Sequence, residues 1–184
     1  MGILHGNLQP PVLGPRVTSR RLLFLFILGL SLALPACAED PVPALQGIVS
    51  WVYDGDTLEI DTVGRVRLIG IDSPEKEASR RDQYLVDQGV SATRQRHIYQ
   101  AAKAFNIKQV KGQRVRLTLD KTPQDRHGRM LAYVHLPDGQ LLNRVLVEQG
   151  LAVVYRRFEF KMKDDFLAAE HKARRSHVGL WAKE

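Results

Sequence analysis

The spacing of apolar residues changes part way along the chain, and this change limits the folds that are open to it. Residues 47–53, 57–60 and 65–71 are short runs rich in β-branched and aromatic side chains, which is typical of strands. From about Ser91 the apolar positions recur every three or four residues, which predicts a helix. The sequence therefore predicts several short strands followed by a helix.

The second half of the chain continues this alternation. Residues 114–119 and 131–136 have strand patterns, and two amphipathic helices follow, the first of which ends at Gly150. The apolar stripe of the last helix consists of Phe158, Met162, Phe166, Ala169 and Ala173. This order of elements belongs to the α+β class. Because the strands are short, we expect them to close into a small barrel that carries the helices.

The first 38 residues differ in composition from the rest, because they contain no acidic residue. Their apolar run, residues 22–34, is shorter than the roughly 20 residues needed to cross a bilayer, and it lies between a basic flank and a small-residue cleavage site at 36–38. The pattern predicts a signal peptide over residues 1–38 that is removed before Glu39. The mature chain is then expected to have no transmembrane segment.

Other interpretations of this segment remain open. It could stay as an uncleaved anchor, or Leu34-Pro35-Ala36-Cys37 could be a bacterial lipoprotein box in which Cys37 becomes a lipid anchor. Arg20-Arg21 also resembles the core of a twin-arginine signal. We expect an exported protein, periplasmic or secreted, with a membrane-anchored lipoprotein as the alternative.

Residues 41–184 contain no linker or repeat, and residues 39–184 are expected to form one domain. 

The mature domain is expected to act as a monomer without a stable protein partner. Its lone cysteine, Cys37, excludes an intramolecular disulfide and a zinc site built from cysteines, and the six histidines show no HExxH spacing. The chain has 27 basic and 20 acidic residues, a net charge of +7, which favours an anionic partner only weakly.

Charged residues gather at the ends of the predicted strands. Residues 54–57 (DGDT) and 72–75 (DSPE) follow two of these strands and are, taken alone, ordinary turn formers. Arg67 stands in a nearly continuous apolar strand, where an unpaired guanidinium is costly to bury. It therefore needs an anionic neighbour, either Asp72 or Glu75 in an internal ion pair or a bound phosphate, which a guanidinium matches with two hydrogen bonds.

These residue types are the ones that phosphodiester hydrolysis requires. Asp56 and Asp72, with a backbone carbonyl nearby, suit Ca²⁺, which prefers oxygen ligands. Glu75 could reach a water beside the metal and act as its base. Arg67 and Arg129 could bind the phosphoryl oxygens that gather negative charge in the transition state.

Segments in this order resemble the thermonuclease, or staphylococcal-nuclease-like (SNase-like), family. The matching segments are 54–57 (DGDT), 66–75 (VRLIGIDSPE), 125–133 (DRHGRMLAY), 142–152 and 179–181 (GLW). The resemblance implies an OB-fold five-stranded β-barrel with about three flanking helices, in a nuclease domain over residues 39–184. It also implies a Ca²⁺-dependent, sugar-nonspecific nuclease that cleaves DNA and RNA, single-stranded or frayed, and leaves 3′-phosphate ends.

The resemblance further implies roles for single residues. The Ca²⁺ ligands would be the side chains of Asp56 and Asp72 and the backbone carbonyl of Ser73, where the family has threonine. The catalytic residues would be Arg67 and Arg129, which bind the scissile phosphate, and Glu75, which acts as the general base.

The substrate-binding positions depart from the family pattern. Arg126 stands in place of a lysine, and His127 in place of a tyrosine that holds the terminal phosphate. Tyr155 lies near an aromatic position that stacks a base, although packing would explain it as well. The polar loop 76–89 is longer than in the best-known member, which changes the rim of the site.

A basic stretch completes the pattern, since residues 89–119 contain no acidic residue. Its cations are Arg94, Arg96, Lys103, Lys108, Lys111, Arg114 and Arg116. It is either a solvated helix face or a flank along which an anionic strand binds. The alternative to a nuclease is a catalytically silent OB-fold module that binds single-stranded nucleic acid.

Overall fold

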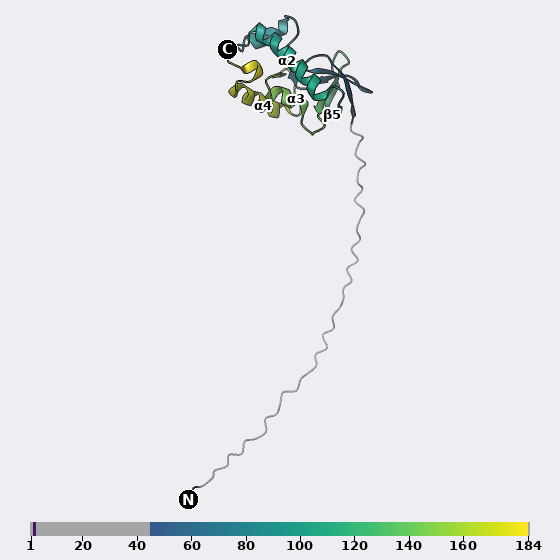
Figure 1. Ribbon diagram of the computed structural model, residues 1–184, viewed down its shortest axis with the longest axis vertical. Helices are drawn as coiled ribbons and strands as arrows, with labels where there is room; N and C mark the ends of the chain where they lie inside the picture. The colour runs from purple at the N-terminus through teal and green to yellow at the C-terminus, as the bar shows by residue number, and fades with distance from the viewer. Residues whose placement is uncertain (1, 3–44, 184) are drawn as a thin grey trace. The chain divides into compact units, whose positions relative to one another are not determined.

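The structure is a computed structural model that describes Gly2 and residues 45–183 (Figure 1). The predicted signal peptide, its cleavage before Glu39 and the lipid anchor at Cys37 lie outside the described residues. The following description concerns residues 45–183.

Five strands form a closed barrel in the order β1-β2-β3-β6-β5. Neighbouring strands are antiparallel except β3 and β6, which are parallel. Their bounds are β1 Gln46–Val52, β2 Thr57–Ile60, β3 Gly64–Leu68, β5 Arg114–Gln124 and β6 Met130–His135. The predicted five-stranded OB-fold barrel is confirmed.

The strand predicted over residues 65–71 is interrupted at Gly70, and in this respect the prediction was wrong. Gly70 has φ +80°, and a Cβ there would lie 2.5 Å from the Phe160 ring. The chain turns at this glycine and continues as β4, Ile71–Asp72, which pairs with β7, Val153–Val154, in a separate two-stranded sheet. The turn carries Asp72 away from the barrel wall.

Helices lie on the outside of the barrel, as Figure 1 shows for α2, α3 and α4. Their bounds are α1 Gln83–Val86, α2 Ala92–Val110, α3 Leu142–Glu148 and α4 Lys163–Arg175, with short 3₁₀ turns η1 at Arg80–Asp82 and η2 at Gly179–Trp181. Ser91 caps α2 by accepting a hydrogen bond from the Arg94 amide. No helix within residues 45–183 is long and apolar enough to span a membrane.

The last helix begins later than its apolar stripe predicts. Phe158 and Met162 precede α4 and were wrongly assigned to it. The ring of Phe158 packs at 5.8 Å from that of Phe160, so the segment before α4 buries its aromatic residues without being helical. The spacing of Phe158 and Met162 therefore reflects packing against the core and not a helix.

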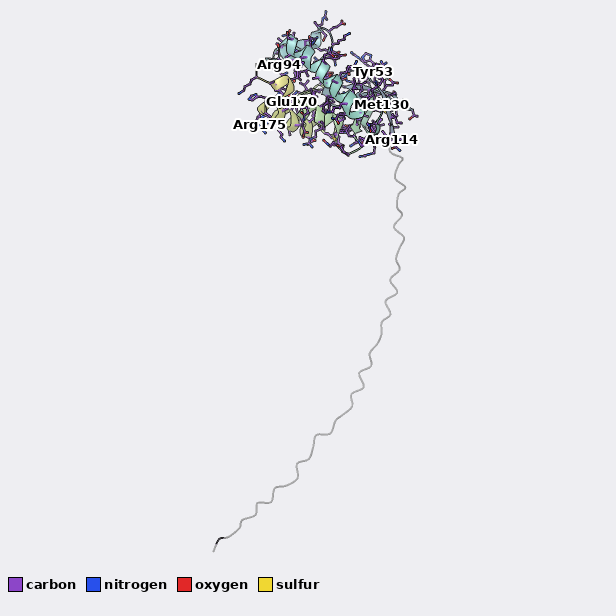
Figure 2. All side chains as sticks on the ribbon, viewed as in Figure 1. Tyr53, Arg94, Arg114, Met130, Glu170 and Arg175 are labelled. Atoms are coloured by element: carbon purple, nitrogen blue, oxygen red, sulfur yellow. The ribbon has the colours of Figure 1, made fainter. Side chains whose placement is uncertain are left out.

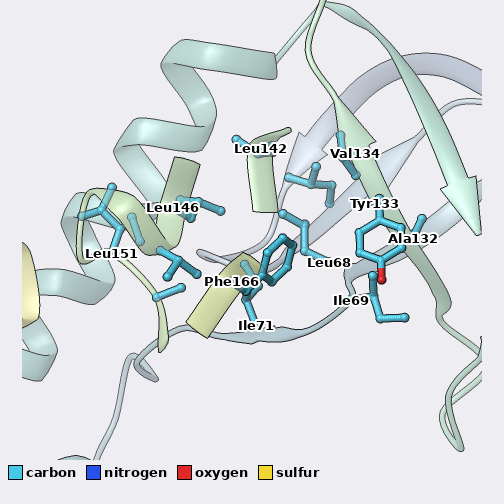
Figure 3. Packing of buried hydrophobic residues seen from close by; sticks show 14 of the residues in the cluster. Leu68, Ile69, Ile71, Ala132, Tyr133, Val134, Leu142, Leu146, Leu151 and Phe166 are labelled. Carbon is cyan, nitrogen blue, oxygen red and sulfur yellow. The ribbon is translucent and has the colours of Figure 1, made fainter. Parts of the chain in front are cut away.

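The core lies between the barrel and the helices α3 and α4 (Figure 3). Phe166 on α4 and Leu146 on α3 are fully buried beside Leu68 of the barrel. Asn143 on α3 is also fully buried, and its amide donates to the carbonyls of Ile69 and Ala132 and accepts from the Val134 amide. These three hydrogen bonds fix α3 against the turn that leads to β4.

A buried carboxylate joins α4 to the same small sheet. Glu170, labelled in Figure 2, is 1% exposed and accepts a 2.8 Å hydrogen bond from the Val154 amide of β7. It also accepts hydrogen bonds from Arg156 and Arg174. Burial alone would raise the pKa of Glu170, but these donors outweigh burial and lower it. Glu170 thus supports the strand that pairs with Ile71–Asp72.

Candidate active site

The barrel strand β3 presents Arg67 to two carboxylates from neighbouring elements. Its Nη1 lies 2.7 Å from Asp56 Oδ1, and its Nη2 lies 2.6 Å from Asp72 Oδ1. The Asp56 carboxylate comes from the turn between β1 and β2, and Asp72 comes from β4. Of the two candidate ion-pair partners, Asp72 and Glu75, the structure therefore pairs Arg67 with Asp72, and it adds Asp56.

Asp56 is buried and connects the turn before β2 to residues 72–75. Its Oδ2 accepts a 2.9 Å hydrogen bond from the Ser73 amide, and its Oδ1 accepts one from the Thr57 hydroxyl. At Gly55 a Cβ would lie 2.5 Å from Ser73 Oγ, so the two turns touch at a position where only glycine fits. The glycine of the DGDT segment is therefore required for close packing against residues 72–75.

The carboxylates repel one another where they meet. Burial, followed by repulsion from Asp56, raises the pKa of Asp54 to about 6, and the same two causes raise the pKa of Asp72. Burial works against the charged form of Arg67, but the charges of Asp56 and Asp72 outweigh it and raise its pKa. The cluster thus favours additional positive charge.

Arg81 supplies such a charge, and sequence reasoning missed it. It lies on η1, in the loop 76–89, and its guanidinium pairs with Asp72 at 2.5 Å and with Glu75. The capping box formed by Ser79 and Asp82 starts this turn and was the available signal for it. Nothing in the sequence indicated that this turn folds back onto the site.

Contacts through Asp82 hold η1 against α2. Arg96 on α2 pairs with Asp82 at 2.8 Å, and the Gln95 amide donates to the Asp82 carbonyl. Gln95 is fully buried. The position from which Arg81 reaches the site is therefore determined by contacts between η1 and α2.

The turn 125–129 holds the second predicted arginine. Arg129 pairs with Asp125, its Nη2 and Nε lying 2.7 and 2.8 Å from Asp125 Oδ2. Burial would raise the pKa of Asp125, but hydrogen bonds from Arg129 and from the His127 amide lower it. The side chains of Arg126 and His127 are exposed at the tip, and Arg126 Nε lies 3.1 Å from His127 Nε2.

A cavity of about 810 Å³ collects these side chains. Eight of the nine predicted site residues line it: Arg67, Asp72, Ser73, Glu75, Arg126, His127, Arg129 and Tyr155. Asp56 is not in the lining, because it lies behind Arg67 with only 5% of its side chain exposed. The Tyr155 ring lies 5.2 Å from that of Phe158, so this residue packs and lines the cavity at once.

The predicted metal ligands have the chemistry that the implied divalent cation needs. Asp56, Asp72 and the Ser73 carbonyl offer only oxygen atoms, which hard cations such as Ca²⁺ prefer. Within residues 45–183 no group of three or more His, Cys, Asp and Glu side chains is arranged to hold a metal. Two carboxylates and one carbonyl would leave most of the shell of a bound cation to water, which Ca²⁺ tolerates. A cation there would also relieve the repulsion between Asp56 and Asp72 that, after burial, raises the pKa of Asp72.

Some cations of the basic stretch 89–119 make contacts within the fold, and others are exposed. Arg96 pairs with Asp82, and Arg94 donates to the Ala182 carbonyl, so both serve the fold. Lys111 and Arg114, by contrast, are exposed at the barrel. Neither of the two interpretations of the stretch describes all its members.

The closed OB-type barrel brings carboxylates and arginines to one cavity. This arrangement is typical of enzymes that cleave phosphodiesters. Residues 65–183 match the family model described as "Staphylococcal nuclease homologue". The chain belongs to the staphylococcal nuclease family.

Individual relatives agree with this assignment. The chain is 35% identical over 142 residues to a thermonuclease of Staphylococcus intermedius. This alignment covers 73% of the chain and 74% of the thermonuclease. The chain is 32% identical over 142 residues to an uncharacterized endonuclease of Escherichia coli O157:H7, which covers 75% and 78%. An uncharacterized protein of Methanocaldococcus jannaschii is 34% identical over 148 residues, covering 73% and 70%. The predicted enzyme class, a nuclease hydrolase, is confirmed.

Proposed function

We propose that this protein is an exported, Ca²⁺-dependent, sugar-nonspecific nuclease that hydrolyses DNA and RNA and leaves 3′-phosphate ends. The observation that carries the proposal is that Arg67, Asp72, Glu75 and Arg129 line one shared cavity. A module that only binds nucleic acid needs neither a general base nor a pair of carboxylates for a metal. The printed names of the relatives, thermonuclease and endonuclease, agree with cleavage.

In the proposed reaction each charged residue has one task. Arg67 and Arg129 donate hydrogen bonds to the non-bridging oxygens of the scissile phosphate, where negative charge develops. Glu75 orients the attacking water and accepts its proton. The water oxygen bonds to phosphorus as the bond from phosphorus to the 5′ oxygen breaks. The 5′ oxygen takes a proton from solvent and leaves as a hydroxyl, and the phosphate stays on the 3′ oxygen of the upstream fragment.

Asp56, Asp72 and the Ser73 carbonyl would hold the cation. When bound, Ca²⁺ supplies Lewis-acid stabilisation of the phosphoryl group. Asp56 is already held by the Ser73 amide, and this contact fixes the spacing between the two turns before any ligand binds. Arg126, His127 and Tyr155 would bind the rest of the substrate from the cavity rim, the last by stacking on a base.

The test is digestion of single-stranded DNA by the mature protein with Ca²⁺, with EDTA and with the variant Glu75→Gln. We expect EDTA to stop cleavage and Glu75→Gln to slow it at least about a hundredfold, as removal of a general base does. Glu77→Gln is the matched control, because Glu77 is exposed and does not line the cavity. Binding without cleavage by the unmodified protein would instead establish the silent module.

Product ends and location are tested separately. A 3′-phosphate end blocks extension by a polymerase until a phosphatase removes it, and a 5′-phosphate end would contradict the proposed bond. Mass spectrometry of the exported protein should give an N-terminus at Glu39. An acylated Cys37 would establish the lipoprotein form instead.

A further inference from the structure

The outer face of the barrel, at the end of β1, exposes aromatic side chains that the proposed function does not use. Trp51 is 51% exposed, and Tyr53 is half-buried. The residue between them, Val52, is buried in the core, so both rings belong to the outer face of the barrel. An exposed tryptophan ring offers a face on which a planar group can stack.

Cations lie directly over both rings. Lys111 Nζ is 4.9 Å from the centre of the Trp51 ring, and Arg65 Cζ is 4.2 Å from the centre of the Tyr53 ring. Arg114 is exposed on β5, opposite Ile48 of β1. We use the name barrel-face strip for five residues: Trp51, Tyr53, Arg65, Lys111 and Arg114. Figure 2 labels two of its members, Tyr53 and Arg114.

Two carboxylates lie near the strip: Glu59 within it, and Asp54, whose charge acts on Arg65. Glu59 lies opposite both Trp51 and Arg65 in the strand register. Tyr53 donates a 3.0 Å hydrogen bond to it, and Arg65 Nε lies 4.0 Å from it. Three cations against these two carboxylates leave a net positive charge around the two rings.

The strip lies near the candidate active site, because Arg65 of the strip and Arg67 of the site are on the same strand. Arg65 and Arg67 alternate with the buried Val66 on β3, so both arginines are on the outer face. Trp51 and Arg65 lie two strands apart in the register, at about 4.8 Å per strand. Arg67 lies two residues, about 6.6 Å, further along β3, so the backbone of Trp51 is roughly 12 Å from that of Arg67. A strand bound at Arg67 would reach Trp51 within a few nucleotides.

We propose that the barrel-face strip binds the single-stranded part of the nucleic acid substrate beyond the scissile phosphate. Trp51 would stack on a base, and Lys111, Arg65 and Arg114 would neutralise phosphates, a combination that binds single strands without reading their sequence. The inference rests on the proposed nuclease function, because it extends the same substrate. It assigns the strip to long substrates only, since a dinucleotide does not reach it.

Kinetics with two substrate lengths test the strip. The variants Trp51→Ala and Lys111→Ala are compared with the unmodified protein on a single strand of about 20 nucleotides and on a dinucleotide. For the long strand we expect KM to rise at least about fivefold in Trp51→Ala, the size of a lost base stack, with kcat nearly unchanged. Lys111→Ala should reduce the slope of log KM against log salt by about 0.7, the value for one phosphate contact on a single strand.

Controls separate the strip from other causes. Trp51→Phe retains an aromatic face and should restore most of the affinity, and Lys172→Ala, an exposed cation on α4, should leave both substrates unaffected. Unchanged long-strand kinetics in Trp51→Ala, or an equal loss on both substrates, would overturn the proposal. If the unmodified protein cleaves neither substrate, the nuclease function fails, and binding of the long strand to Trp51→Ala by fluorescence anisotropy then decides the strip alone.

Discussion

The buried carboxylate of Glu170 links the stability of the fold to the position of Asp72. It accepts hydrogen bonds from the Val154 amide on β7, and β7 pairs with β4, where Val153 lies opposite Asp72. Replacing Glu170 with alanine removes the acceptor for this amide and for two arginines. We therefore expect Glu170→Ala to lower both the free energy of unfolding and the nuclease rate.

The magnitude follows from burial. Removing one partner of a buried ion pair costs about 3–5 kcal/mol when the other charge stays buried. The side chains of Arg156 and Arg174 are 40% and 32% exposed, so water compensates them in part, and the loss should fall near the lower limit, about 3 kcal/mol. For a domain of this size that corresponds to a decrease in Tm of roughly 10 °C.

The assay is urea unfolding followed by circular dichroism, with nuclease rate measured on the same samples. Glu159→Gln is the matched control, because the Glu159 side chain is 87% exposed and should change stability by less than about 0.5 kcal/mol. The pKa of Glu170 is lowered in the folded protein, so its contribution is present above its ordinary value of 4.5 and is lost as the pH falls through the folded pKa. A Glu170→Ala variant within about 1 kcal/mol of the unmodified protein at pH 7 would refute this reasoning.

Three further predictions concern single contacts. Arg81→Ala removes the cation that competes for Asp72, so calorimetry should show Ca²⁺ binding tightened by about twofold to fivefold, the value of one partly exposed ion pair. Asn143→Ala leaves the Val134 amide and the Ile69 carbonyl unpaired in the core and should cost about 2–5 kcal/mol in urea unfolding. Gly70→Ala introduces a Cβ that contacts the Phe160 ring at positive φ, and it should lower Tm and activity together, whereas an unchanged Tm would contradict the tight packing there.

Local signals were sufficient for most of the barrel and its helices. Ser91 precedes a helical pattern and caps α2, and Gly150, with φ +64°, follows α3 as predicted. Both outcomes depend on the preferences of one or two residues. The segment 158–162 misled the same reasoning, because its aromatic residues pack into the core from a chain that is not helical.

The sequence by itself determined the class of fold, the family and the set of charged residues, because these are carried by short segments whose order and content are read directly. Only the tertiary structure decided which charges meet. It paired Arg67 with Asp56 and Asp72, Arg129 with Asp125, and Glu75 with Arg81. The reason is physical: a pairing between distant segments depends on the turn at Gly70 and on how η1 is fastened to α2, and neither leaves a local pattern in the chain.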